Sequence, residues 1–133
     1  MSYVALATAR FDEVARFYED DLGFPVIESW EHSNGRSRVF SLNGLRLEIL
    51  DNAREKHPLR LLEPADRFHL VIEVDDVEAV HRQLEITTPP LRTTSWGARL
   101  FQVRDPDGVP VTFLQWEEEA GRRRWPQHDI TPP

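Results

Sequence analysis

The sequence contains the same succession of one helix and four strands twice, and this repeat restricts the fold more than any other feature. In each half, a short apolar run precedes apolar residues at helical spacing, and three strand-like runs follow. A shift of 66 residues places Tyr3 on His69, Leu6 on Ile72 and Val14 on Val80. We therefore expect an α+β fold of two βαβββ modules. Each module would carry its helix on one face of a curved mixed sheet, and the opposite faces would enclose a shared cleft.

Local signals set the expected element boundaries. The first half predicts a helix over 11–22 and strands over 3–8, 26–31, 37–42 and 45–50. The second half predicts a helix over 77–84 and strands over 69–74, 91–94, 99–104 and 111–116. Gly23 suits a left-handed helix end, and Asp75 or Asp76 can cap the second helix. Tight turns are expected at Asn34-Gly35, at Asn43-Gly44 and over residues 105–108.

The chain length and the net charge limit the possible domain organisation and the possible binding partners. The chain of 133 residues predicts one domain over 1–118, with modules at 1–52 and 66–118, a connector at 53–65 and a tail at 119–133. The net charge is −7, which argues against nucleic acid as a partner, so we interpret the Arg run at 122–124 as a solvated segment. No apolar run is long enough to span a membrane, and we expect a cytoplasmic protein without membrane contact.

Three groups of residues carry a family resemblance. They are Phe17-Tyr18 with Leu22-Gly23-Phe24, the Trp96-Gly97 pair, and Asp105-Pro106-Asp107-Gly108. With the repeat, they resemble the vicinal oxygen chelate superfamily over residues 3 to 116, closest to its glyoxalase and bleomycin-resistance branches. This resemblance implies the paired-module fold. It also implies a homodimer, with the cleft formed within one chain or between two.

The resemblance places metal-ligand positions at Tyr3, Glu48, His69 and Thr112. A divalent ion needs about three protein ligands, usually His and carboxylate. Tyrosine would ligate only as a phenolate, and a neutral threonine hydroxyl is a poor ligand. We therefore expect no cofactor, although a divalent metal on Glu48 and His69 remains an alternative. The same two residues are our candidate catalytic pair, and they could instead share a hydrogen bond that serves proton transfer or has only a structural role.

Further side chains are expected to line the ligand-binding cleft: Tyr3, Arg46, Trp96, Phe101 and Thr112. Aromatic and charged groups together suit a planar or cationic ligand. The first hypothesis is a metal-independent protein that binds a small, drug-like molecule. The alternative is a metal-dependent lyase or isomerase that uses Glu48 and His69, and a third hypothesis is a cleft filled by the tail. No phosphate-binding loop or serine-nucleophile motif is present in the sequence.

Overall fold

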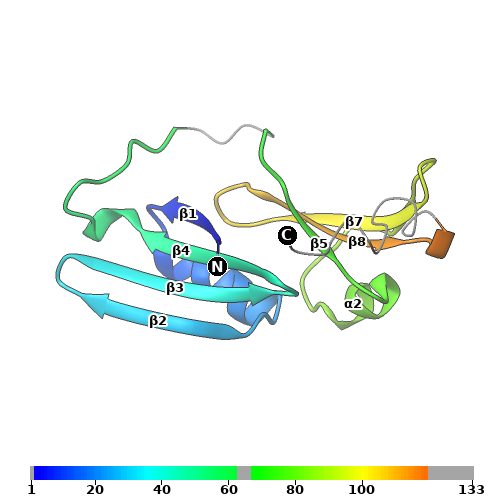
Figure 1. The fold of residues 1–133 in the computed structure, drawn as a ribbon, viewed down its shortest axis with the longest axis horizontal. Coiled ribbons are helices and arrows are strands. Elements are labelled where there is room, and N and C mark those ends of the chain that lie inside the picture. Colours follow the sequence, from blue (N-terminus) through cyan, green and yellow to red (C-terminus); the bar gives the residue numbers. More distant parts are fainter. Residues whose placement is uncertain (1, 63–66, 120–133) are drawn as a thin grey trace, which may run out of the picture.

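Two four-stranded mixed sheets form the protein, as the sequence predicts. The computed structural model describes residues 2–62 and 67–119. The first sheet has the order β1-β4-β3-β2, with β1 (Val4–Thr8), β2 (Val26–His32), β3 (Gly35–Leu42) and β4 (Leu45–Asp51). The second has the order β5-β8-β7-β6, with β5 (Leu70–Glu73), β6 (Arg92–Thr93), β7 (Ala98–Arg104) and β8 (Pro110–Trp116). In each sheet the first strand pairs in parallel with the last (Figure 1).

Each module also carries the predicted helix. In the first module, α1 (Phe11–Arg16) continues into η1 (Phe17–Asp21), a π-helical segment in which Leu22 N–H donates to the carbonyl of Phe17. Gly23 follows with a φ of +75°, which glycine adopts at no steric cost. In the second module, Asp76 caps α2 (Val77–Gln83) by accepting a hydrogen bond from Ala79 N–H. A short 3-10 helix, η2 (Asn52–Arg54), follows β4.

The turns agree with the prediction at Asn43-Gly44 and over residues 105–108, and they differ at Asn34-Gly35. Asn43 and Gly44 both have positive φ, as the tight turn between β3 and β4 requires. The first turn, however, lies at Ser33 and Asn34, and Gly35 is the first residue of β3. A Cβ atom on Gly35 would lie 2.7 Å from the ring of Trp30. The absence of a side chain at Gly35 therefore leaves space for an indole ring. Its φ is not positive, unlike that of Gly44.

One hydrophobic core joins the two modules. The sheet faces that carry the helices contribute to it together, with Phe11, Val14 and Tyr18 from the first helical segment and Phe101 and Phe113 from the second sheet. The rings of Phe24 and Phe113 stack across the module boundary with centroids 6.0 Å apart. Because both helix-side faces are used in this way, the opposite face of each sheet is open.

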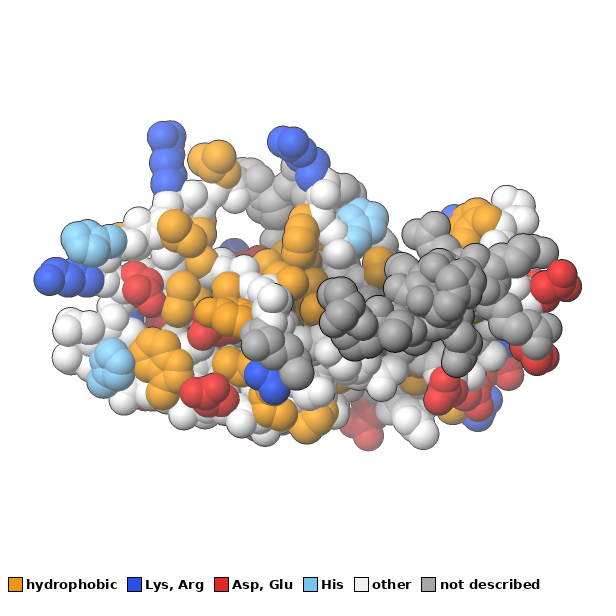
Figure 2. All heavy atoms as spheres, viewed as in Figure 1, with side chains coloured by type: hydrophobic (Ala, Val, Ile, Leu, Met, Phe, Trp, Pro, Cys, Tyr) orange, Lys and Arg blue, Asp and Glu red, His pale blue; other side chains and the backbone are white. Residues whose placement is uncertain are grey.

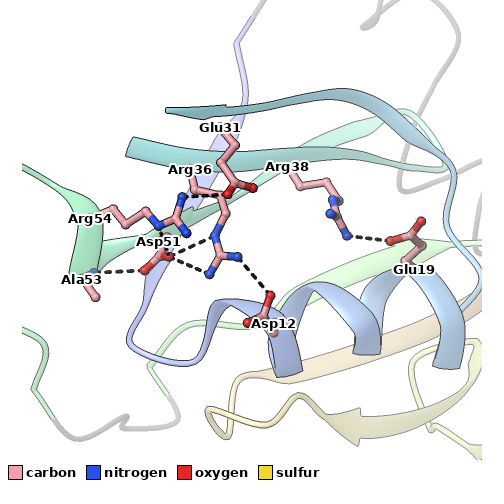
Figure 3. Close-up of polar contacts among 8 residues, drawn as sticks. All are labelled: Asp12, Glu19, Glu31, Arg36, Arg38, Asp51, Ala53 and Arg54. Carbon is pink, nitrogen blue, oxygen red and sulfur yellow. Dashed lines mark hydrogen bonds and ion pairs between the residues drawn. The ribbon is translucent and has the colours of Figure 1, made fainter. Parts of the chain in front are cut away.

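An ion-pair network closes the end of this core beside α1 (Figure 3). Arg36 Nη2 lies 2.8 Å from Asp51 Oδ2 and its Nη1 lies 3.1 Å from Asp12 Oδ1. The guanidinium also lies over the ring of Phe11, with 4.2 Å between Cζ and the ring centroid. Arg54 reaches the same carboxylate more loosely, at 3.8 Å.

The open faces expose apolar side chains. Figure 2 shows hydrophobic side chains on the molecular surface over the first sheet. Tyr3 on the first module, and Val71 and Trp96 on the second, are among the large hydrophobic residues that remain exposed. No helix in the described part of the chain is long and apolar enough to cross a membrane.

Candidate functional site

The open face of the second sheet contains a hollow of about 630 Å³. This volume is in the range of pockets that hold drug-sized ligands. Its apolar lining consists of Val71, Pro89, Pro90, Leu91, Leu100 and Leu114. Its polar lining consists of His69, Arg92, Gln102 and Thr112, and Trp96 and Phe101 border it as well.

The strand register explains why these residues meet. Arg92 pairs with Leu100, and Leu100 pairs with Leu114, so the three side chains form one row across β6, β7 and β8. A second row contains Gln102 and Thr112. Because side chains alternate between faces, both rows point away from the helix side. Leu100 and Leu114 are buried and form an apolar floor.

Trp96 stands at the edge of this floor. Gly97, with a φ of +94°, turns the chain into β7 directly after it, and Thr94 and Ala98 close the turn with hydrogen bonds. The Trp96 ring meets Trp116 edge-on, with centroids 5.3 Å apart. Trp116 is itself held by an indole N–H bond to Glu73 Oε1. Trp96 stays 53% exposed, so part of its ring surface is available to a ligand.

The polar groups of the hollow include several hydrogen-bond donors. The Thr112 side chain is buried, and its Oγ1 accepts a 2.9 Å bond from Gln102 Nε2. Its own hydroxyl proton can therefore be donated to a bound molecule. His69 and Arg92 are exposed at the rim.

The structure brings together four of the predicted site residues at the hollow, which are His69, Trp96, Phe101 and Thr112. Phe101 lies there mainly as a core residue. Its strand borders the hollow, but its ring packs in the core, 5.1 Å from the ring of Phe113 and 4.9 Å from that of His81 on α2. Because side chains alternate along β7, Leu100 and Gln102 point to the open face and Phe101 points to the core.

Sequence reasoning missed Arg92 and Gln102 as site residues. The alternation rule, applied to β7 from Leu100, would have selected Gln102. Arg92 belongs to a strand of two residues, which carries no alternation signal of its own.

The remaining predicted residues lie on the open face of the first sheet. Tyr3, Arg46 and Glu48 share that face by alternation, and Tyr3 is 58% exposed. Glu48 Oε2 accepts a 2.6 Å hydrogen bond from the buried Ser37 hydroxyl. Within the described residues, no hydrogen bond or ion pair joins Glu48 to His69. Glu48 is also not among the described residues that line the hollow around His69.

The donor set does not fit a metal centre within one chain. No group of three or more His, Asp or Glu side chains that could hold an ion occurs among residues 2–62 and 67–119. At the four positions implied by the resemblance, the Thr112 hydroxyl bonds Gln102 and the Glu48 carboxylate bonds Ser37. Two of the four, Tyr3 and Thr112, are poor ligands as neutral hydroxyls.

The fold and the hollow define a class of protein, namely one with two βαβββ modules and a small-molecule-sized hollow on an open sheet face. The model of the Glyoxalase/Bleomycin resistance protein/Dioxygenase superfamily matches residues 1–113, and the chain belongs to that superfamily. The search of curated proteins gave no match.

Solved structures show the same fold. SMU.1112c is 25% identical with a TM-score of 0.65, and the match covers 86% of this chain and 96% of that one. Lactoylglutathione lyase from Agrobacterium tumefaciens is 19% identical with a TM-score of 0.62, covering 86% and 92%. TnmS3, an antibiotic binding protein from Streptomyces sp. CB03234, is 20% identical with a TM-score of 0.61, covering 88% and 98%.

Proposed function

We propose that this protein binds a small organic molecule in the hollow of the second module without a metal ion. The observation that carries the proposal is the hollow itself, which has an apolar floor, an exposed indole at its edge and a few convergent donors. Such a composition is typical of ligand pockets, in which apolar surface supplies affinity and a few polar groups fix orientation.

The comparisons are compatible with binding and with catalysis. TnmS3 is described as antibiotic binding, whereas the Agrobacterium protein is described as a lyase. One fold therefore hosts both roles, and the choice depends on site chemistry. Binding is favoured here because the ligand positions hold a phenol and an alcohol where a metal-dependent enzyme needs imidazole or carboxylate.

Two features of the protein bear in opposite ways on which ligand charge it would prefer. The net charge of −7 attracts a cationic, drug-like ligand over long range. The carboxylate that would pair with such a cation, Glu48, is on the first sheet and outside the hollow.

We also propose that the protein is a cytoplasmic homodimer. The open face of the first sheet leaves Tyr3 exposed, and a second copy that covers this face would remove its apolar surface from water. Light scattering should give twice the chain mass of 15.5 kDa. A monomer at all concentrations tested would contradict this part of the proposal.

Fluorescence and calorimetry test the binding function. A panel of drug-like molecules is titrated into wild type, Trp96→Ala and Trp30→Ala, the last being a matched control because Trp30 lies on the first sheet. We expect binding that Trp96→Ala weakens about tenfold and that Trp30→Ala leaves unchanged. Equal affinity in all three proteins would exclude the hollow as the site.

Elemental mass spectrometry tests metal independence. Wild type and Glu48→Gln, purified without chelator or affinity tag, are compared. We expect no stoichiometric metal in either protein. Close to one equivalent in wild type that is lost in Glu48→Gln would replace our proposal by a metal-dependent lyase or isomerase.

A further inference from the structure

The geometry points to a planar, aromatic ligand that bears an anionic oxygen group, such as an aromatic carboxylate. This inference rests on the proposed function, because it names the chemical class that the same hollow would accept. It differs from the expectation that the net charge of the chain suggests.

The charge of the hollow is opposite to that of the chain. Asp and Glu outnumber Lys and Arg by 23 to 16 over the whole sequence. Among the described residues that line the hollow, none is Asp or Glu, whereas the cationic Arg92 is present. At short range, local groups outweigh distant charges that solvent and salt screen.

The closest carboxylate in the sheet register lies outside the lining of the hollow. Glu73 pairs with Leu114 across β5 and β8 and so shares the open face. Its Oε1 accepts the indole N–H of Trp116, and Glu73 is not among the described residues that line the hollow. The carboxylate therefore holds the Trp116 ring, against which Trp96 packs.

Arg92 is suited to bind an anionic group. It makes no ion pair within the described part of the chain, so its guanidinium can bind a ligand carboxylate through two parallel N–H bonds. The Thr112 hydroxyl supplies another donor, since its oxygen already accepts from Gln102. A molecule rich in acceptor oxygens would satisfy both groups.

The floor of the hollow favours a flat ligand body. Leu100 and Leu114 lie in the same cross-strand row as Arg92, on neighbouring strands about 5 Å apart. A ring placed over these two leucines would have Trp96 at its edge and would direct its acidic substituent towards Arg92. Pro89 and Pro90 form a rigid wall of the same hollow.

Three matched naphthalene compounds test the inference: 2-naphthoate, 2-naphthylmethanol and 2-naphthylmethylamine. Calorimetry measures their affinities for wild type, Arg92→Gln and Arg16→Gln, in the full chain. We expect 2-naphthoate to bind at least about tenfold more tightly than the amine. Arg92→Gln should remove this preference and leave the affinity for the alcohol unchanged, whereas Arg16→Gln, an exposed position on α1, should have no effect.

The outcomes separate this inference from the proposed function. If the amine or the alcohol binds as tightly as 2-naphthoate and Trp96→Ala weakens both, the hollow is a binding site and the anionic preference is wrong. If 2-naphthoate is preferred but Arg92→Gln keeps the preference, the assignment to Arg92 is overturned. If none of the three compounds binds, the inference is overturned, and the panel titration then decides the proposed function separately.

Discussion

The Tyr18 hydroxyl donates a 2.8 Å hydrogen bond to Asp105 Oδ2, across 87 positions of the chain and across the boundary between the two modules. Both side chains are buried. The other carboxylate oxygen of Asp105 accepts the backbone N–H groups of Asp107 and Val109, which shape the turn between β7 and β8. One carboxylate thus fixes a turn in the second module and attaches it to the helical segment of the first.

Replacing Tyr18 by phenylalanine should lower the free energy of unfolding by about 1–3 kcal/mol, because a buried carboxylate oxygen loses its hydrogen-bond donor. Urea denaturation measures this change. Tyr3→Phe is the control, since the Tyr3 side chain is exposed and its change should stay within about 0.5 kcal/mol of zero. Equal effects of the two substitutions would show that the bond between the modules adds nothing to stability.

Asp105 should give stability an unusual dependence on pH. Burial raises the pKa of Asp105 above the ordinary value of 3.8, although the hydrogen bonds from Val109, Tyr18 and Asp107 oppose this rise. The folded chain therefore holds this proton more tightly than the unfolded chain. As the pH rises from about 4 through the raised pKa, the contribution of Asp105 to stability falls.

The comparison of wild type with Asp105→Asn isolates this contribution. The stability of the variant relative to wild type should increase between pH 4 and pH 7, as measured by urea denaturation at each pH. In Tyr18→Phe the pKa of Asp105 should rise further, because a hydrogen bond that lowers it is removed. A difference between variant and wild type that is constant with pH would contradict this prediction.

The sequence predicts the elements well because their signals are local. Helical spacing, the positive φ at Gly23 and the cap at Asp76 each depend on a few neighbouring residues. Where the prediction fails, the residues that matter lie on the neighbouring strand. Gly35 begins β3, and the ring of Trp30 on β2 occupies the space that a Cβ atom there would need, which the Asn-Gly pair alone does not reveal.

The candidate site was predictable only in part for a related reason. His69, Trp96 and Thr112 belong to one module, and alternation along their strands brings them to one face. The proposed pairing of Glu48 with His69 depends on how two separate sheets face one another. No periodicity within either sheet specifies that relationship.

Gly35→Ala should cost about 1–3 kcal/mol of unfolding free energy, because the new methyl group would overlap the Trp30 ring. The ring must then leave its stacked position on His32, where the centroids are 4.9 Å apart. Near-UV circular dichroism should report this movement. In a Trp30→Ala background the same substitution should cost much less. An equal cost in both backgrounds would point to the backbone and away from the ring.

Arg36→Ala should destabilise the protein more than any loss of a surface ion pair. The Asp51 carboxylate is buried, with a side chain only 6% exposed, and both Nε and Nη2 of Arg36 donate to its Oδ2. Without Arg36 it would keep the Ala53 N–H and the looser Arg54. Since the Arg36 side chain is itself 19% exposed, we expect a loss of about 2–4 kcal/mol, towards the lower side of buried-pair values.

Arg54→Ala provides the matched control on the same network. Arg54 bonds the exposed Glu31 at 2.9 Å, and such surface pairs contribute about 0–1 kcal/mol. Asp51→Asn combined with Arg36→Ala should cost less than the sum of the single changes, because removing the carboxylate charge relieves the need for its partner. Chemical denaturation of the four variants measures this coupling. If Arg36→Ala costs no more than Arg54→Ala, solvent reaches the Asp51 carboxylate more freely than its burial indicates.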